Sequence, residues 1–144
     1  SLRYMLEDIQ KLNKDKNSIN FLISLKDIYG DHGIISMVNL KIIKGEIIFI
    51  ENFLMSCRVL GRNLDSWILN EVVKICKKNK YKFIIGEYIK SEKNELVKKI
   101  YPQNNFNQIK DNNYLKKYIT TTNIKNCYVF EVGKNKIPNL EIYE

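Results

Sequence analysis

The chain has 144 residues, of which 44% are hydrophobic and 28% are charged, as expected of one globular domain. Lysine and arginine number 24 against 16 aspartate and glutamate residues, and the net charge of +8 favours acidic or phosphorylated partners. The apolar runs are too short for a membrane span or a secretory signal. We therefore expect a single soluble domain over residues 1–144 that binds anions.

The cysteine and histidine content limits the chemistry. One histidine, His32, excludes metal sites that need several imidazole ligands. The three cysteines, Cys57, Cys76 and Cys127, match no zinc or disulfide spacing, so we expect no metal and a reducing, cytoplasmic compartment. Walker, Rossmann, serine-hydrolase and phosphatase motifs are absent. Because the chain begins at Ser1, we also expect it to be part of a longer polypeptide.

The first half of the chain predicts a helix and then strands. Apolar residues between Leu2 and Leu12 recur at helical spacing. The β-branched and aromatic runs that follow indicate three strands, with a glycine turn after the first strand and a Lys44-Gly45 turn before the third. These strands are expected over residues 21–25, 34–43 and 46–55.

The second half of the chain alternates helices with strands. A helix is expected from about Asp65, because its apolar residues share one face and it ends in lysines that suit the helix dipole. A buried strand over residues 82–89, a helix from Ser91 that Pro102 stops, and a strand over residues 127–132 complete the order. This order predicts an α+β fold with one mixed, mostly antiparallel sheet flanked by helices.

The junction between a strand and a helix at residues 53–63 carries the motif Arg58-x-x-Gly61-x-Asn63. Such a junction exposes backbone N–H groups at a helix N-terminus, where the helix dipole also favours negative charge. Gly61 lets the backbone approach a ligand closely, and Arg58 and Arg62 add positive charge. The junction is a candidate pyrophosphate site, and the alternative is an ordinary glycine turn with two solvated arginines.

About thirty residues further on, a second motif resembles one of the GNAT acyltransferase superfamily, N-x-x-A-x-x-x-Y-x-x-x-G-F. It runs Asn94-x-x-Val97-x-x-x-Tyr101-x-x-x-Asn105-Phe106. The junction motif likewise resembles the superfamily's (Q/R)-x-x-G-x-(G/A) motif. Each motif has asparagine, Asn63 and Asn105, where the superfamily prefers glycine, and asparagine is the other residue that best tolerates a positive φ.

The resemblance implies a GNAT-like fold in which two neighbouring parallel strands, over residues 46–55 and 82–89, splay apart to admit a pantetheine arm. That arm belongs to acyl-CoA or to the phosphopantetheine of an acyl carrier protein. The resemblance also places Tyr101 where it protonates the leaving thiolate. The residues that it implies for cofactor binding are Arg58, Leu60, Gly61, Arg62, Asn63 and Asn94.

A closer resemblance is to the C-terminal domain of FkbH-like proteins of HAD subfamily IIIC. It is carried by the strings SLKDIYGDHGII, FLMSCRVLGR and GEYIKSEKN…YPQNNF. Members of that family join a phosphatase-type domain to a GNAT-like domain and load glyceryl groups onto acyl carrier proteins in polyketide and related pathways. The resemblance therefore implies an N-terminal HAD-type domain in the full-length chain and an acidic acyl carrier protein as partner.

Four residues are candidates for catalysis. Cys57 lies beside Arg58 near a helix N-terminus, a setting that favours the thiolate, so it is a candidate acyl carrier or else a small residue that fills a strand end. Tyr101 is the candidate acid, or else a core aromatic residue. Glu51 and Glu87 lie on the two strands expected to splay, where each is a candidate general base or an ordinary polar strand residue.

Three functions are consistent with these residues. The first is transfer of an acyl group, such as glyceryl, to a carrier-protein or CoA thiol, with Cys57 holding the group transiently. The second is an acetyl-CoA-dependent N- or O-acetyltransferase with Glu51 or Glu87 as base and Tyr101 as acid. The third is a non-catalytic docking module for an acidic carrier protein. The lysines over residues 74–82 are interpreted as a solvated helix end, so nucleic acid is not an expected partner.

Overall fold

The computed structural model describes residues 3–8, 16–56, 63–88, 99–110, 113–119 and 124–138. The strands are β1 (Arg3–Asp8), β2 (Ser18–Asp27), β3 (Gly30–Ile43), β4 (Ile47–Met55), β5 (Phe83–Glu87), β6 (Asn107–Gln108) and β7 (Cys127–Glu131). The helices are α1 (Leu64–Asn79), α2 (Ile100–Gln103) and the 3-10 helices η4 (Tyr114–Tyr118) and η5 (Ile124–Asn126). No helix in this part of the chain is long and apolar enough to cross a membrane.

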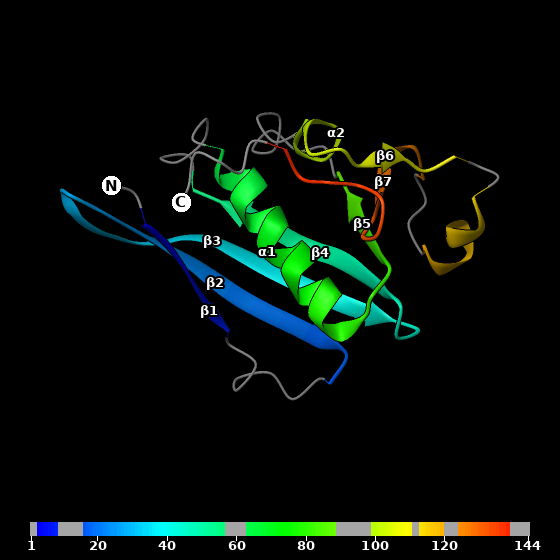
Figure 1. Cartoon of the computed structure of the whole chain (residues 1–144), viewed down its shortest axis with the longest axis horizontal. Helices are drawn as coiled ribbons and strands as arrows, with labels where there is room; N and C mark the ends of the chain where they lie inside the picture. Colours follow the sequence, from blue (N-terminus) through cyan, green and yellow to red (C-terminus); the bar gives the residue numbers. More distant parts are fainter. Residues whose placement is uncertain are drawn as a thin grey trace.

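The described strands form one mixed sheet in the order β1-β2-β3-β4-β5-β7-β6. Neighbouring strands are antiparallel except for β4 and β5, which run parallel. A parallel pair needs a crossover connection, and α1 supplies it by crossing one face of the sheet between these two strands (Figure 1). The expected α+β class, with a mostly antiparallel sheet, is confirmed.

A β-bulge in β4 changes which of its residues face α1. The pairing between β3 and β4 shifts by one residue at Glu51, so Glu51 is an extra residue on its strand. Before the bulge, Ile48 and Ile50 belong to the core beneath α1, whereas after it Phe53 and Met55 pack against that core. The bulge therefore sets the register of the second half of β4 and leaves Glu51 exposed.

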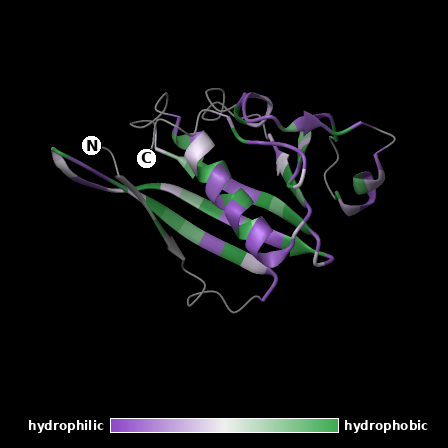
Figure 2. Ribbon diagram, in the orientation of Figure 1, coloured by the Kyte–Doolittle hydropathy of each residue, from purple (hydrophilic) through white to green (hydrophobic). Residues whose placement is uncertain are grey.

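Apolar side chains form a core on each face of the sheet. The larger core lies between the strands and α1, and Phe21, Ile48, Leu69 and Phe130 are completely or almost completely buried in it. Figure 2 shows hydrophobic residues along the strands beneath α1. The smaller core lies on the opposite face and contains Ile47, Ile85, Ile109, Leu115 and Cys127. Residues from the polar segment after α2 therefore cover part of the second face.

The helix predicted near the N-terminus is wrong, because Arg3–Asp8 form strand β1. This strand pairs antiparallel with β2 over six residues, and these backbone hydrogen bonds outweigh the helical spacing of a few apolar residues. Leu6 packs against the larger core, whereas Met5, its neighbour on the other face, is 36% exposed. This difference between neighbouring residues fits the two-residue repeat of a strand.

The predicted strands and the helix expected from about Asp65 are confirmed with different ends. The turn between the first two predicted strands is shorter than expected, because Asp27 already pairs with Gly30. Pro102 lies within α2, which ends one residue later at Gln103, and the part of that helix expected from Ser91 lies outside the described residues. Strand β6 was not predicted, because two exposed polar residues carry no strand pattern.

We expect Lys80→Gly to stabilise the protein. Lys80 ends α1 in the left-handed conformation with φ 62°, which glycine adopts without the steric cost that a side chain imposes. The free energy of unfolding should rise by about 1 kcal/mol, measured by urea denaturation. The matched control Lys78→Gly lies inside α1 and should lower it by about 1 kcal/mol. Equal effects of the two substitutions would contradict the left-handed conformation of Lys80 at the end of α1.

Candidate functional site

Strands β4 and β5 remain paired over only four residues each. Their last pair is Ile50 with Gly86, after which β4 continues to Met55 with β3 as its partner. The sheet therefore opens between the two parallel strands just where the bulge residue Glu51 lies. This is the divergence expected from the sequence resemblance.

Tyr101 of α2 lies directly over Gly86, the last residue of β5 that pairs with β4. A Cβ atom at Gly86 would overlap the Tyr101 ring, so only glycine permits this approach. The ring stacks on Tyr128 with 5.9 Å between centroids and contacts Phe106 at 5.1 Å. Tyr101 is only 6% exposed, and these contacts fix its side chain beside the opening of the sheet.

The environment of Tyr101 keeps its phenol protonated. Burial raises the pKa of Tyr101 far above its usual value, with smaller contributions from Cys127 and Glu87. A phenol of this kind does not give up its proton readily, but it donates a hydrogen bond to negative charge that develops nearby. Tyr101 is therefore a candidate hydrogen-bond donor on the α1 side of the opening.

The two candidate carboxylates lie at different places around the opening. Glu51 lines a hollow together with Phe49, whose side chain packs against the smaller core, so Glu51 is on the face away from α1. Glu87 ends β5 and pairs in register with Cys127 of β7. Tyr101 belongs to the larger core, so Tyr101 and Glu51 approach the same opening from opposite faces of the sheet.

Asn63 and Asn105 both adopt the left-handed conformation, with φ values of 54° and 66°. These are the two positions where the GNAT pattern prefers glycine, so the expected tolerance of asparagine for positive φ is confirmed. The Asn63 carbonyl accepts a hydrogen bond from the Trp67 N–H at the start of α1. The Asn105 side-chain amide donates to the Lys136 carbonyl over 2.8 Å.

Asn104 joins the start of α1 to α2 and was not among the residues predicted from the sequence. It is fully buried, and its amide nitrogen donates to Asp65 Oδ2 and to the Ile100 carbonyl, both over 2.8 Å. Its amide oxygen accepts from the Ser66 hydroxyl over 2.7 Å. Asp65 and Ser66 lie 39 and 38 residues away in sequence, so no local pattern revealed this contact.

The remaining predicted site residues lie outside the described residues. They are Cys57, Arg58, Leu60, Gly61, Arg62 and Asn94. The pyrophosphate site therefore stays a prediction, which α1 supports only by beginning where expected. Cys76 and Cys127 are buried, as predicted, and burial raises the pKa of each thiol to about 12. The described residues contain no group of three His, Cys, Asp or Glu side chains that could hold a metal ion.

Solved structures with the same fold include GNAT acetyltransferases. A domain from Methanocaldococcus jannaschii is 12% identical, with TM-score 0.68 over 91% of this chain and 99% of that one. A GNAT acetyltransferase from Staphylococcus aureus is 13% identical, with TM-score 0.67 over 92% and 99%. A GNAT family acetyltransferase from Elizabethkingia anophelis, with acetyl-CoA bound, is 15% identical, with TM-score 0.58 over 89% and 97%. No protein-family profile and no curated protein matches the chain. The fold is GNAT-like.

We expect Gly86→Ala to disturb the site through Tyr101. The added methyl group has no room beside the ring, and overpacking of this kind lowers the free energy of unfolding by about 1–3 kcal/mol. The matched control is Gly133→Ala, where a Cβ meets no atom within 4 Å, and it should change stability by less than about 0.5 kcal/mol. Thermal unfolding of both variants tests the contact, and equal stability would contradict it.

Proposed function

We propose that the protein is an acyltransferase that moves an acetyl or similar acyl group from CoA to an amine or hydroxyl acceptor. The observation that carries this proposal is the opening between β4 and β5, with Tyr101 fixed over Gly86 on one face and Glu51 on the other. The GNAT acetyltransferases that share the fold support it, above all the one solved with acetyl-CoA bound.

The opening suits a thioester that carries a pantetheine arm. Where a strand loses one of its neighbours, backbone N–H and C=O groups on that edge become available to a ligand. The amides of a pantetheine arm have the spacing of an extended chain, and N–H donors beside the thioester stabilise the oxyanion that forms during transfer. Beyond Ile50, β4 provides such an edge on the side away from β3.

In the proposed reaction, Glu51 accepts a proton from the acceptor amine. The nitrogen lone pair then attacks the thioester carbonyl carbon, so that a C–N bond forms and the C–S bond breaks. The nitrogen loses a second proton as it becomes an amide, and the sulfur leaves with the bonding electrons and takes up that proton. One protonated amine and one thioester thus yield one amide, one thiol and the proton held by Glu51. Tyr101 donates a hydrogen bond to the sulfur as its negative charge develops. Glu87 is the second candidate base.

A second candidate is the finer reaction that the FkbH-like resemblance implies, in which Cys57 carries a glyceryl group to the thiol of an acyl carrier protein. The net charge of +8 favours it, because acyl carrier proteins are acidic and opposite charges promote association. In this reaction the acyl group becomes attached to the protein, whereas in direct transfer it does not. The two reactions are therefore separable by mass.

Acetyl-CoA should bind with a dissociation constant between roughly 1 μM and 1 mM, measured by isothermal titration calorimetry. Tyr101→Phe removes only the hydroxyl, so it should leave binding unchanged and lower kcat on the order of 10²-fold, because the leaving sulfur loses a hydrogen-bond donor. The control Tyr29→Phe changes a tyrosine that is 87% exposed and should retain full activity. Absence of binding at millimolar acetyl-CoA would contradict the proposed function.

Intact-mass analysis should find no acyl adduct after incubation with acetyl-CoA, and Cys57→Ser should retain kcat. Cys76 and Cys127 do not complicate the measurement, because at neutral pH thiols with a pKa of about 12 are almost entirely protonated and unreactive. An adduct that forms in the native protein and disappears in Cys57→Ser would instead favour the carrier-protein reaction.

A further inference from the structure

A hollow of about 360 Å³ lies beside Glu51 on the sheet face away from α1. It is open to solvent and is lined by residues of β3, β4, the turn between these strands and η4. Its lining residues are Lys41, Ile42, Ile43, Lys44, Phe49, Glu51 and Tyr118. A hollow of this volume is at the lower end of the range for small-molecule sites, so it has room only for a small ligand.

The charges around the hollow are mostly positive. Lys41 and Lys44 line it, and neither forms an ion pair with any residue in the part of the chain that the structure describes. The Lys117 ammonium lies 5.1 Å from the centre of the Tyr118 ring, which adds a third cation beside the lining. Glu51 is the only acidic residue among the lining residues. The cations are thus available to a ligand with a negative group.

The positive and negative lining residues lie at different ends of the hollow. Lys41 is opposite Phe49 in the pairing of β3 with β4, and Glu51 comes two residues after Phe49, about 7 Å further along the strand. Lys44 lies beyond Lys41 in the turn, with φ 54°. The lysines therefore occupy the end toward the turn, and Glu51 occupies the end at the opening of the sheet.

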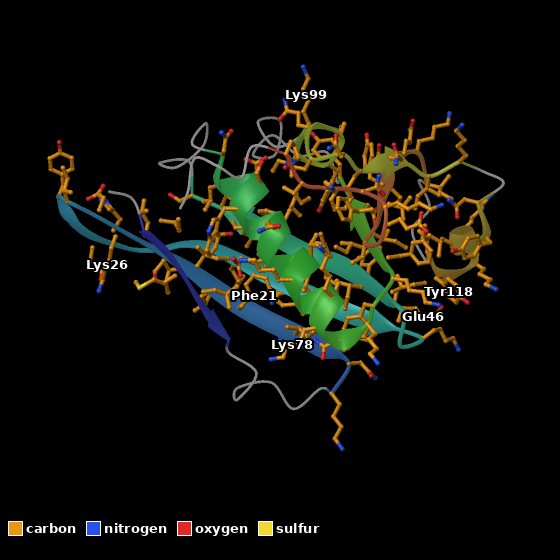
Figure 3. The ribbon with its side chains drawn as sticks, in the orientation of Figure 1. Phe21, Lys26, Glu46, Lys78, Lys99 and Tyr118 are labelled. Atoms are coloured by element: carbon orange, nitrogen blue, oxygen red, sulfur yellow. The ribbon has the colours of Figure 1, made fainter. Side chains whose placement is uncertain are left out.

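The aromatic side chains lie against the smaller core and form the apolar part of the hollow. Phe49 and Tyr118 are both half-buried there. Figure 3 shows Glu46 at the end of the sheet that carries the turn between β3 and β4, and shows Lys78 at the C-terminal end of α1. Lys78 is not a lining residue, so it is a suitable control for the lysines that are.

We propose that this hollow binds the acyl acceptor, and that the acceptor is a small primary amine that also carries an anionic group, either carboxylate or phosphate. Lys41 and Lys44 bind the anion, and Glu51 takes the proton from the amine at the opening. This inference rests on the proposed function, since it names the acceptor for that reaction. The anion fixes the orientation of the amine toward the thioester.

Matched ligand pairs test the inference by ligand-observed NMR titration, which needs no turnover. The pairs are leucine with leucinamide, and phosphoethanolamine with ethanolamine, and each differs in its anionic group. With the protein in the presence of CoA, which has no acyl group to transfer, the anionic member of at least one pair should bind about tenfold more tightly, because each lysine adds a charge-assisted hydrogen bond. The pair that shows the preference identifies the anion.

Variants assign the preference to the hollow. Lys41→Gln and Lys44→Gln should each reduce it about threefold, and the double variant should abolish it, whereas Lys78→Gln should leave it unchanged. The inference is overturned if neither anionic ligand binds more tightly than its partner, or if the preference survives in the double variant. Calorimetry with acetyl-CoA tests the proposed function separately, because absence of acetyl-CoA binding would contradict that function. The NMR titration alone decides whether the hollow prefers an anionic ligand.

Discussion

The close approach of Tyr101 to Gly86 is the contact on which the site depends. It occurs at the last point where β5 pairs with β4, so the ring occupies the space above β5 just before the sheet opens. A residue with a side chain at this position would force the ring and α2 away from the sheet. The absence of one side chain thus fixes the distance between α2 and the sheet, and with it the position of the phenol.

Asn104 extends this constraint to the other end of the site. Its amide connects the first turn of α1, through Asp65 and Ser66, with the short helix that contains Tyr101. The predicted pyrophosphate site lies just before that turn. A buried amide whose nitrogen and oxygen are both hydrogen-bonded is expensive to disrupt, so Asn104 holds the first turn of α1 and the short helix with Tyr101 in a fixed relation to each other.

The sequence was a good guide to local features and a poor guide to distant ones. The glycine turn before β4, the start of α1 and the positive φ at Asn63 follow from local residue chemistry, and the structure confirms them. Strand β1 was mistaken for a helix because its conformation is decided by β2, ten residues further on. The bulge at Glu51 was missed because it depends on the register with β3, and the hollow depends on η4, whose residues carry no apolar pattern.

The bulge has a further consequence for how this site can diversify. The inserted residue Glu51 is exposed, whereas Ile50 before it and Phe53 two residues after it both contact the larger core. The side chain at position 51 is therefore not packed in either core, and exchanging it changes the polar group beside the opening without altering those cores. A substitution at this one exposed position therefore changes the side chain beside the opening while the rest of the scaffold stays the same.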